Sequence, residues 1–290
     1  MIFINRMPLS MQIDPAHTTI VAFLAVVKQE ANLRNSVCCL VSGLVAYRED
    51  DTRLLHAILV PEEELTIVKI SNAARAQELL GDNYIGEDAW KKLGIEDSSL
   101  PLLPPLSDEM LAEARRLQEL EDEPLLVLDL GKSIAEMEIL CTAKDITVLK
   151  ADGDAEKLRA EACYQARGTG SRWLLLPGSD HGVLPGSRNK TYDNQVKYME
   201  STYPGYAVGG ARELVTVAML KHIQDGTVLF PTEPYTWGRC KEQYKTGGWK
   251  GDRVALGGNS CSASGGLVIG LNDVVIANDN SGLFCLLVVF

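Results

Sequence analysis

Residues 211–226 read ARELVTVAMLKHIQDG, and this stretch carries the strongest secondary-structure signal in the chain. Its apolar residues recur at helical spacing, and Gly226 follows where a helix would end. We therefore predict an amphipathic helix that ends near Gly226. From Thr227 onward the chain is rich in Gly, Asn, Asp and Ser with short β-branched runs, a composition that favours short strands joined by loops.

Shorter elements are expected on the N-terminal side of this helix. Apolar runs bounded by polar or turn residues predict strands, and Ser71 and Ser107 are typical helix N-caps. The expected strands lie within LLHAILV (54–60), LTIVKI (65–70), PLLVLDL (124–130) and RWLLLPGS (172–179), and the expected helices cover residues 71–80, 107–121 and 154–168.

The stretch SSLPLLPPLS, residues 98–107, concentrates proline and serine and predicts a boundary between two parts of the chain. The first part, 1–123, is expected to be a smaller α/β segment whose role the sequence does not indicate. The second, 124–290, is expected to combine helices with short strands and loops. The fold class predicted for the whole chain is therefore α+β.

The composition excludes several classes of protein. The chain has 290 residues, 46% of them hydrophobic, and a formal net charge of −11. This apolar content argues against intrinsic disorder, and the acidic balance argues against a nucleic-acid-binding protein. No run approaches the roughly 18–20 apolar residues of a membrane span, and no signal peptide is recognisable. Display on a virion or cell surface is compatible with these expectations.

The cysteines and histidines do not form a recognisable metal or disulfide pattern. The seven cysteines are irregularly spaced, and the chain has only four histidines. An odd, scattered set of cysteines favours free thiols in the core over a disulfide framework. No His, Cys or carboxylate group has metal-ligand spacing, so no metal and no cofactor are expected.

Two clusters of polar residues are candidates for a catalytic or binding site. Asp180 and His181 are adjacent in GSDHG, but neighbouring loop residues seldom point at one another, so a turn is favoured over a catalytic pair. The basic run SRNK at 187–190, together with Arg172 and Lys197, is interpreted as a solvated loop.

Charge is distributed unevenly along the chain. The last basic residue is Arg253, and the 37 residues that follow contain two charged residues, Asp273 and Asp279. The same stretch, 254–290, has no Glu, Lys, Gln, Met or Trp. Against ordinary residue usage, this absence has a chance on the order of one in a few thousand. Burial explains such an absence in strands, but the stretch also contains Asn, Gly and Ser at loop-like spacing.

Three motifs that follow the helix in order carry a family resemblance. They are YTWG at Tyr235–Gly238, RVALGGNS at Arg253–Ser260 and SGLFCLL at Ser281–Leu287. Their order resembles that of the C-type lectin-type fold, in the branch that contains formylglycine-generating enzymes. The resemblance implies a C-type lectin-like domain over residues 124–290, with RWLLLPGS as its first strand.

The enzymes of this branch carry two cysteines about five residues apart, shortly after the glycine motif. The corresponding positions here, near Ser262 and Leu267, are not cysteines, and Cys261 is displaced by one residue. The departure argues against sulfatase-activating chemistry, so no enzymatic activity is expected. A related enzyme with Cys261 as its nucleophile is kept as an alternative.

The chain also resembles the variable proteins of diversity-generating retroelements, which occur in viruses and prokaryotes. In that family the copied template is mutated at adenines, often in AAC codons. Changing the two adenines of AAC gives fifteen amino acids, but never Gln, Glu, Lys, Met or Trp. Residues 254–290 lack these same five types.

This resemblance implies a non-enzymatic ligand-binding protein with a hypervariable region at about residues 257–285. Its implied partner is a protein or cell-surface ligand, with a role in host or cell attachment, and an oligomer is compatible with it. An undiversified virion or structural protein of the same fold is a further alternative. The implied variable positions are Asn259, Cys261, Ser262, Ser264, Val268, Gly270, Asn272, Asp273, Val275, Asn278, Asp279 and Asn280. The implied scaffold residues are Trp173, Trp237, Gly257, Gly258, Gly282 and Leu283.

Overall fold

The computed structural model describes five strands near the N-terminus and most of the chain from residue 72 onward. The described residues are 2–4, 7–9, 37–42, 45–47, 65–70, 72–101, 104–144, 146–149, 156, 158–178, 182–231, 233, 236–245, 252–261, 267–272 and 281–289. They form two compact units, which divide between Arg75 and Ala76. The combination of helices with mixed sheets is the predicted α+β class.

The first unit contains a five-stranded sheet with the order β2-β1-β5-β3-β4. β1 pairs with β5 in parallel, and the other neighbours are antiparallel. The predicted strand at 65–70 is confirmed as β5, whereas the one expected at 54–60 lies outside the described residues. The strands are β1 (Ile2–Ile4), β2 (Met7–Leu9), β3 (Val37–Ser42), β4 (Val45–Tyr47) and β5 (Leu65–Ile70).

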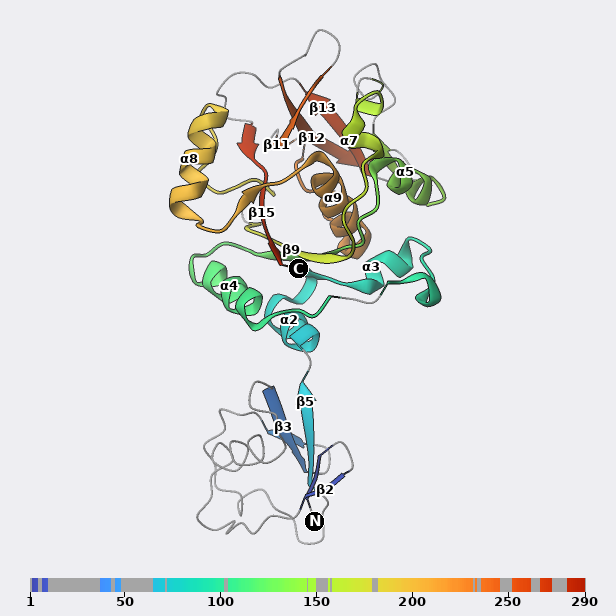
Figure 1. Ribbon diagram of the computed structural model, residues 1–290, viewed down its shortest axis with the longest axis vertical. Coiled ribbons are helices and arrows are strands. Elements are labelled where there is room, and N and C mark those ends of the chain that lie inside the picture. Colours follow the sequence, from blue (N-terminus) through green and yellow to red (C-terminus); the bar gives the residue numbers. More distant parts are fainter. Residues whose placement is uncertain are drawn as a thin grey trace. The chain divides into compact units, whose positions relative to one another are not determined.

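The second unit contains two five-stranded sheets (Figure 1). The first sheet has the order β10-β15-β9-β7-β6, and the second has the order β14-β11-β12-β13-β8. The strands of the first sheet are β6 (Tyr84–Ile85), β7 (Leu125–Asp129), β9 (Arg172–Leu176), β10 (Ala207–Val208) and β15 (Cys285–Val289). Those of the second are β8 (Thr147–Leu149), β11 (Trp237–Gln243), β12 (Arg253–Cys261), β13 (Leu267–Asn272) and β14 (Ser281–Leu283).

The predicted long helix is α9 (Ala211–Asp225), and it lies between the two sheets (Figure 1). Gly226 ends it in the left-handed conformation, with φ of +79°, as predicted. The predicted amphipathic character is wrong, because every residue from Ala211 to Lys221 is buried. A helix with strands on both sides has no solvent-facing stripe, so its polar side chains must find partners inside the protein.

Among the described residues from 72 onward, the structure gives bounds for six further α-helices. Ser107 caps the helix predicted after it, since its hydroxyl accepts a hydrogen bond of 3.2 Å from the Met110 N–H. The continuous helix predicted over 154–168 is wrong: residues 156, 158 and 159 are helical, but Glu161 and Ala166 have extended backbones, so α7 covers four residues between them. The helices are α2 (Asn72–Leu80), α3 (Glu87–Lys92), α4 (Asp108–Glu119), α5 (Ile134–Thr142), α7 (Ala162–Gln165) and α8 (Tyr192–Thr202).

The boundary between the units lies earlier than the one predicted at residue 123. β6 pairs in parallel with β7, which attaches the region before the proline-rich stretch to the first sheet. The Trp90 indole N–H donates to the Leu128 carbonyl at 2.8 Å, and the Trp173 indole N–H donates to the Pro104 carbonyl at 3.0 Å. The proline-rich stretch is therefore packed within the second unit rather than linking two units.

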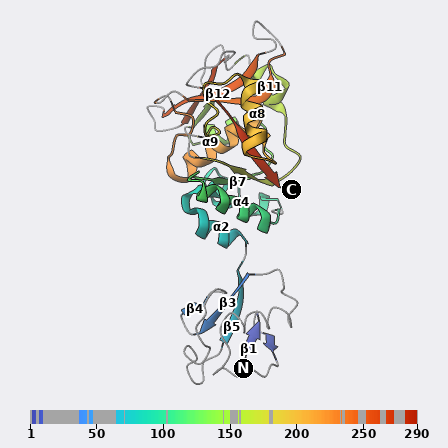
Figure 2. The ribbon, with the colours of Figure 1, turned by 90° about the vertical axis from the view of Figure 1, so that its left-hand side faces the viewer.

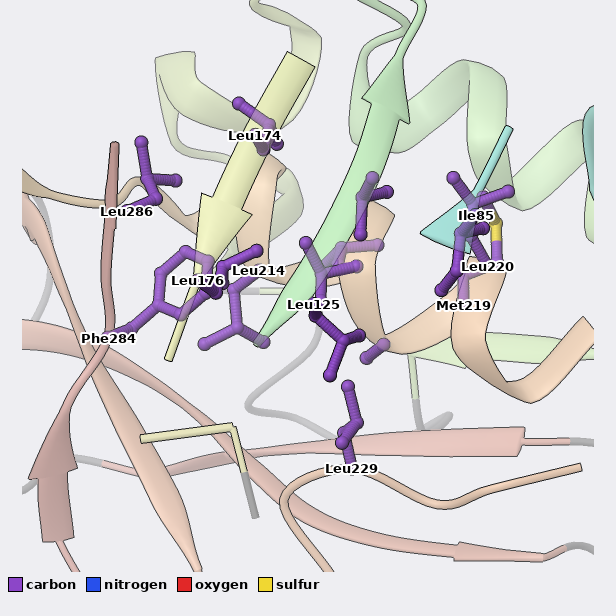
Figure 3. Packing of buried hydrophobic residues seen from close by; sticks show 14 of the residues in the cluster. Ile85, Leu125, Leu174, Leu176, Leu214, Met219, Leu220, Leu229, Phe284 and Leu286 are labelled. Carbon is purple, nitrogen blue, oxygen red and sulfur yellow. The ribbon is translucent and has the colours of Figure 1, made fainter. Parts of the chain in front are cut away.

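Phe284 lies where the chain passes from the second sheet to the first. Its N–H donates to the Arg239 carbonyl at 3.1 Å, and its carbonyl accepts from the Gly209 N–H at 2.9 Å. Its ring is fully buried and contacts the Phe230 ring edge-on, with the centroids 6.0 Å apart. A Cβ on Gly209 would lie 2.2 Å from Phe284 Cε1, so this close approach requires glycine. Figure 3 shows Phe284 within the apolar cluster that includes Leu176 and Leu214.

Truncation of this ring tests its contribution. We expect Phe284→Ala to lower the free energy of unfolding by about 3–5 kcal/mol, because it leaves a cavity between the sheets. The matched control is Ile139→Ala, at a side chain that is 74% exposed, which should change it by no more than about 0.5 kcal/mol. Urea unfolding measures both. Equal losses in the two variants would contradict the buried position of Phe284.

Candidate functional site

β12 and β13 form the antiparallel pair that contains residues 257–261 and 267–272 of the predicted variable region. In their register Ala255 lies opposite Asn272, Gly257 opposite Gly270, and Ser260 opposite Val268. β8 pairs in parallel with the other edge of β13, so β13 has a strand on both sides. Among the described residues, the pairing with β8 is limited to Val268 and Ile269 of β13.

The two faces of this sheet differ. Leu256 is fully buried, and its neighbour on β11 is Gly238, where a Cβ would lie 2.6 Å from Leu214 of α9. The face that includes Leu256 therefore packs against α9. Since alternate residues of a strand lie on opposite faces, Ala255 and Gly257 are on the other face.

The candidate residues on β13 share that second face. Val268, Gly270 and Asn272 are spaced by two, which puts them on one face of the strand. Opposite residues of an antiparallel pair lie on the same face, and Asn272 lies opposite Ala255. The three candidates are thus on the face away from α9, although they were chosen from the sequence without a register.

An irregularity in β12 interrupts the ladder between Gly257 and Ser260. Gly257 has φ of +154°, and a Cβ there would lie 2.2 Å from the Thr236 carbonyl oxygen. Gly258 and Asn259 lie within the irregularity. Bulges of this kind bend a strand and redirect its side chains, and they are common beside binding sites.

The structure describes only some of the predicted variable positions. Asn259 and Cys261 lie on β12, with Cys261 opposite Leu267. Val268, Gly270 and Asn272 lie on β13. The remaining candidates are outside the described residues: Ser262, Ser264, Asp273, Val275, Asn278, Asp279 and Asn280.

Most of the predicted scaffold residues lie in the interior. Trp173 is 2% exposed, and its ring stacks on Tyr84 with the centroids 5.5 Å apart. A Cβ on Gly282 would lie 2.5 Å from Val183 Cβ, and Leu283 is fully buried. Gly257 is buried and Trp237, which begins β11, is half-buried. Gly258 lies on β12.

A shallow groove of about 420 Å³ lies beside the start of β12. The Arg253 guanidinium lies 4.0 Å from the centroid of the Tyr192 ring, one of the groove residues. Sequence reasoning did not identify this groove, although the helical spacing of residues 192, 196 and 200 is visible in the sequence. The lining residues are Tyr192, Asp193, Val196, Lys197 and Glu200 from one face of α8, and Val208 from β10.

Four charged residues form a buried cluster between the first sheet and α9. Asp129 accepts two hydrogen bonds of 2.8 Å from Arg212 and one of 3.1 Å from Arg172, and Glu213 is paired with both arginines. Burial opposes ionisation of Glu213, but the charges of Arg212, Lys241 and Arg172 and a backbone hydrogen bond together lower the pKa of Glu213. The predicted solvated position of Arg172 is therefore wrong, since its side chain is only 12% exposed.

The four cysteines whose side chains the structure describes are not suited to thiol chemistry. Cys141, Cys163, Cys240 and Cys285 are free, which confirms the prediction for these four. Burial raises the pKa of all four thiols, to about 12 for Cys141 and about 11 for Cys163. A thiol with so high a pKa is protonated and unreactive at neutral pH.

The part of the chain that the structure describes contains neither a metal-binding group of side chains nor a membrane-spanning helix. There, no three His, Cys, Asp or Glu side chains are grouped so that they could hold a metal ion. No helix within the described ranges is long and apolar enough to cross a membrane. Asp180 and His181 lie outside the described residues.

No family model matches the chain, and neither a curated protein nor a solved structure matches it. The sequence pattern and the geometry of β12 and β13 are therefore the grounds for a functional proposal.

The supporting helix α5 begins with a capping box. Ser133 Oγ accepts from the Glu136 N–H at 3.2 Å, and Glu136 accepts from the Ser133 N–H at 3.0 Å. The hydrogen bond from Arg167 is the main cause that lowers the pKa of Glu136, from 4.5 to about 2. α5 contacts β8, the strand on the edge of β13, so this box supports the edge of the candidate site.

This lowered pKa makes a pH-dependent prediction. The ionised Glu136 stabilises the fold above about pH 4.5, and this stabilisation is lost as the pH falls toward 2. We expect Glu136→Gln to be less stable than the natural chain at about pH 6, with a difference that shrinks at about pH 3. Urea midpoints at the two pH values measure this. A difference that does not change with pH would contradict the assigned pKa.

Proposed function

We propose that this chain is a non-enzymatic ligand-binding protein with a C-type lectin-like C-terminal domain. In this proposal a retroelement diversifies residues at about 257–285, and the resulting surface recognises changing partners. The partner is a protein or another cell-surface ligand, bound for attachment to a host or cell. The single observation that carries the proposal is the absence of Glu, Lys, Gln, Met and Trp from residues 254–290.

The order of the elements supports the resemblance to the C-type lectin-type fold. β9, the expected first strand of the domain, pairs antiparallel with β15, the expected last strand. Between them come α9, the strand β11 with Trp237 and Gly238, and the glycine-containing strand β12. This is the order that the three sequence motifs imply.

The second sheet separates the proposed variable positions on β13 from the packing against α9, and Ala255, opposite Asn272, is itself fully buried. One face of β12 is packed against α9, so substitutions there would disturb the core. Val268, Gly270 and Asn272 share the other face. A binding surface that varies must be separated in this way from the residues that hold the fold.

The composition of the region also indicates how a ligand would be bound. With two charged residues among 37, contacts from this stretch would depend mainly on shape and on the burial of apolar surface. Such contacts change specificity readily when side-chain size changes.

Comparison of related isolates tests the proposal. We expect substitutions to concentrate at the twelve candidate positions and the frame residues to stay constant. A nearby repeat should match the codons of about 257–285 and differ almost only where the repeat has adenine, with a reverse-transcriptase gene beside it. Sequencing the locus in several isolates provides both observations.

The outcomes separate the alternatives. An invariant 257–285 segment with no adjacent repeat would overturn the proposal and favour an undiversified virion or structural protein. A thiol-dependent activity that Cys261→Ala abolishes would favour the enzyme alternative.

Gly257 and Gly270 provide a matched pair, because they lie opposite each other in the register. We expect Gly257→Ala to lower the free energy of unfolding by about 1–3 kcal/mol, since φ is +154° and the Cβ would meet the Thr236 carbonyl. Gly270→Ala, at a proposed variable position, should change it by no more than about 0.5 kcal/mol. Thermal unfolding compares the two. If Gly270→Ala lowered the free energy of unfolding as much as Gly257→Ala, the proposal that position 270 tolerates substitution would be contradicted.

A further inference from the structure

A buried polar group lies at the junction of α8, β11 and β14. We call it the Gln195 cluster, and it consists of Gln195, Arg239, Ser187 and Ser281, each no more than 1% exposed. Arg239 Nη1 donates to Gln195 Oε1 at 3.1 Å. Gln195 Nε2 donates to the carbonyls of Ser187 at 2.9 Å and of Ser281 at 3.1 Å.

The cluster joins segments that are distant in the sequence. Gln195 comes from α8 and Arg239 from β11, and Figure 2 shows these two elements next to each other. Ser187 belongs to the loop before α8, and its hydroxyl accepts from the Leu283 N–H at 2.9 Å. Ser281 begins β14, the strand that follows residues 273–280.

β14 needs such support because it is short. It has three residues and pairs in parallel with β11 on one side. On the other side, the Leu283 carbonyl accepts a hydrogen bond from the Leu184 N–H, and the Leu283 N–H donates to the Ser187 hydroxyl. A strand of this length has few ladder bonds to fix its register. Directional hydrogen bonds from a buried amide select one register, whereas apolar packing tolerates a shift.

We propose that Gln195 and Arg239 are positioning residues, which fix β14 and thereby the C-terminal end of the ligand-binding region. The inference rests on the proposed function, because it assigns the support of that same region. The other end is fixed by the pairing of Asn272 with Ala255.

Glutamine is suited to this position by its chemistry. Its amide provides an acceptor for the arginine and donors for the two carbonyls, and the structure uses both functions. An apolar side chain of similar length would leave two buried carbonyls and the guanidinium without this partner. A glutamate would keep the acceptor but remove both donor bonds.

Amide hydrogen exchange in the full chain, without any ligand, tests the inference. In Gln195→Met we expect the amides of residues 281–284 to exchange about tenfold faster, relative to those of 125–129 in β7. The control is Thr216→Val, which removes a buried hydroxyl bonded to the Arg212 carbonyl and touches none of the cluster. In this control, the exchange rate of residues 281–284 relative to that of residues 125–129 should not rise.

Gln195→Glu separates the two functions of the amide. Its carboxylate still accepts from Arg239, so exchange in 237–243 should remain close to that of the natural chain. Exchange in 281–284 should rise, because both bonds to the carbonyls are lost. This difference within one variant would not arise from a general loss of stability.

An unchanged exchange ratio in both Gln195 variants would overturn the inference, as would a uniform rise across the chain. These results do not depend on diversification. A fixed β14 in a chain whose 257–285 segment is invariant among isolates would uphold the positioning role and reject the proposed function alone.

Discussion

The buried ion pairs between α9 and the first sheet are the constraint on which the second unit depends. α9 lies between two sheets, so Arg212 and Glu213 at its start have no access to water. They are tolerated there because Asp129 of β7 and Arg172 of β9 neutralise them. Removing one partner from such a group leaves an uncompensated buried charge, which typically costs about 3–5 kcal/mol. The cluster therefore fixes the helix relative to the sheet beneath it.

The two sheets are held to this helix by different means. The first is held by charge pairs, and the second by apolar contacts such as that of Gly238 with Leu214. The second sheet contacts α8 through the Gln195 cluster near its β14 edge, and β8 forms its other edge. Its frame thus combines residues outside the stretch of unusual composition, such as Gly238 and Arg239, with residues inside it, such as Leu256.

The sequence predicted the elements whose signals are local. Gly226 ended α9 and Ser107 capped α4, because each acts within a few residues. The burial of α9 on every side was not predictable, since it depends on two sheets formed by distant segments. The position of Arg172 was missed for the same reason, as its partners are 43 and 41 residues away. The composition of 254–290 identified candidates on β13, but only the register placed Val268, Gly270 and Asn272 on one face.

The pairing of β15 with β9 has a consequence for how the chain folds. The helices α8 and α9 and the whole of the second sheet except β8 lie between these two strands in the sequence. The β9–β15 contact therefore closes a large loop, and the entropy lost in closing it is recovered only when the core beneath has formed. Such non-local pairing slows folding and leaves an edge of β9 exposed in the meantime. The second unit is thus expected to be a slow folder that benefits from chaperones until β15 is in place.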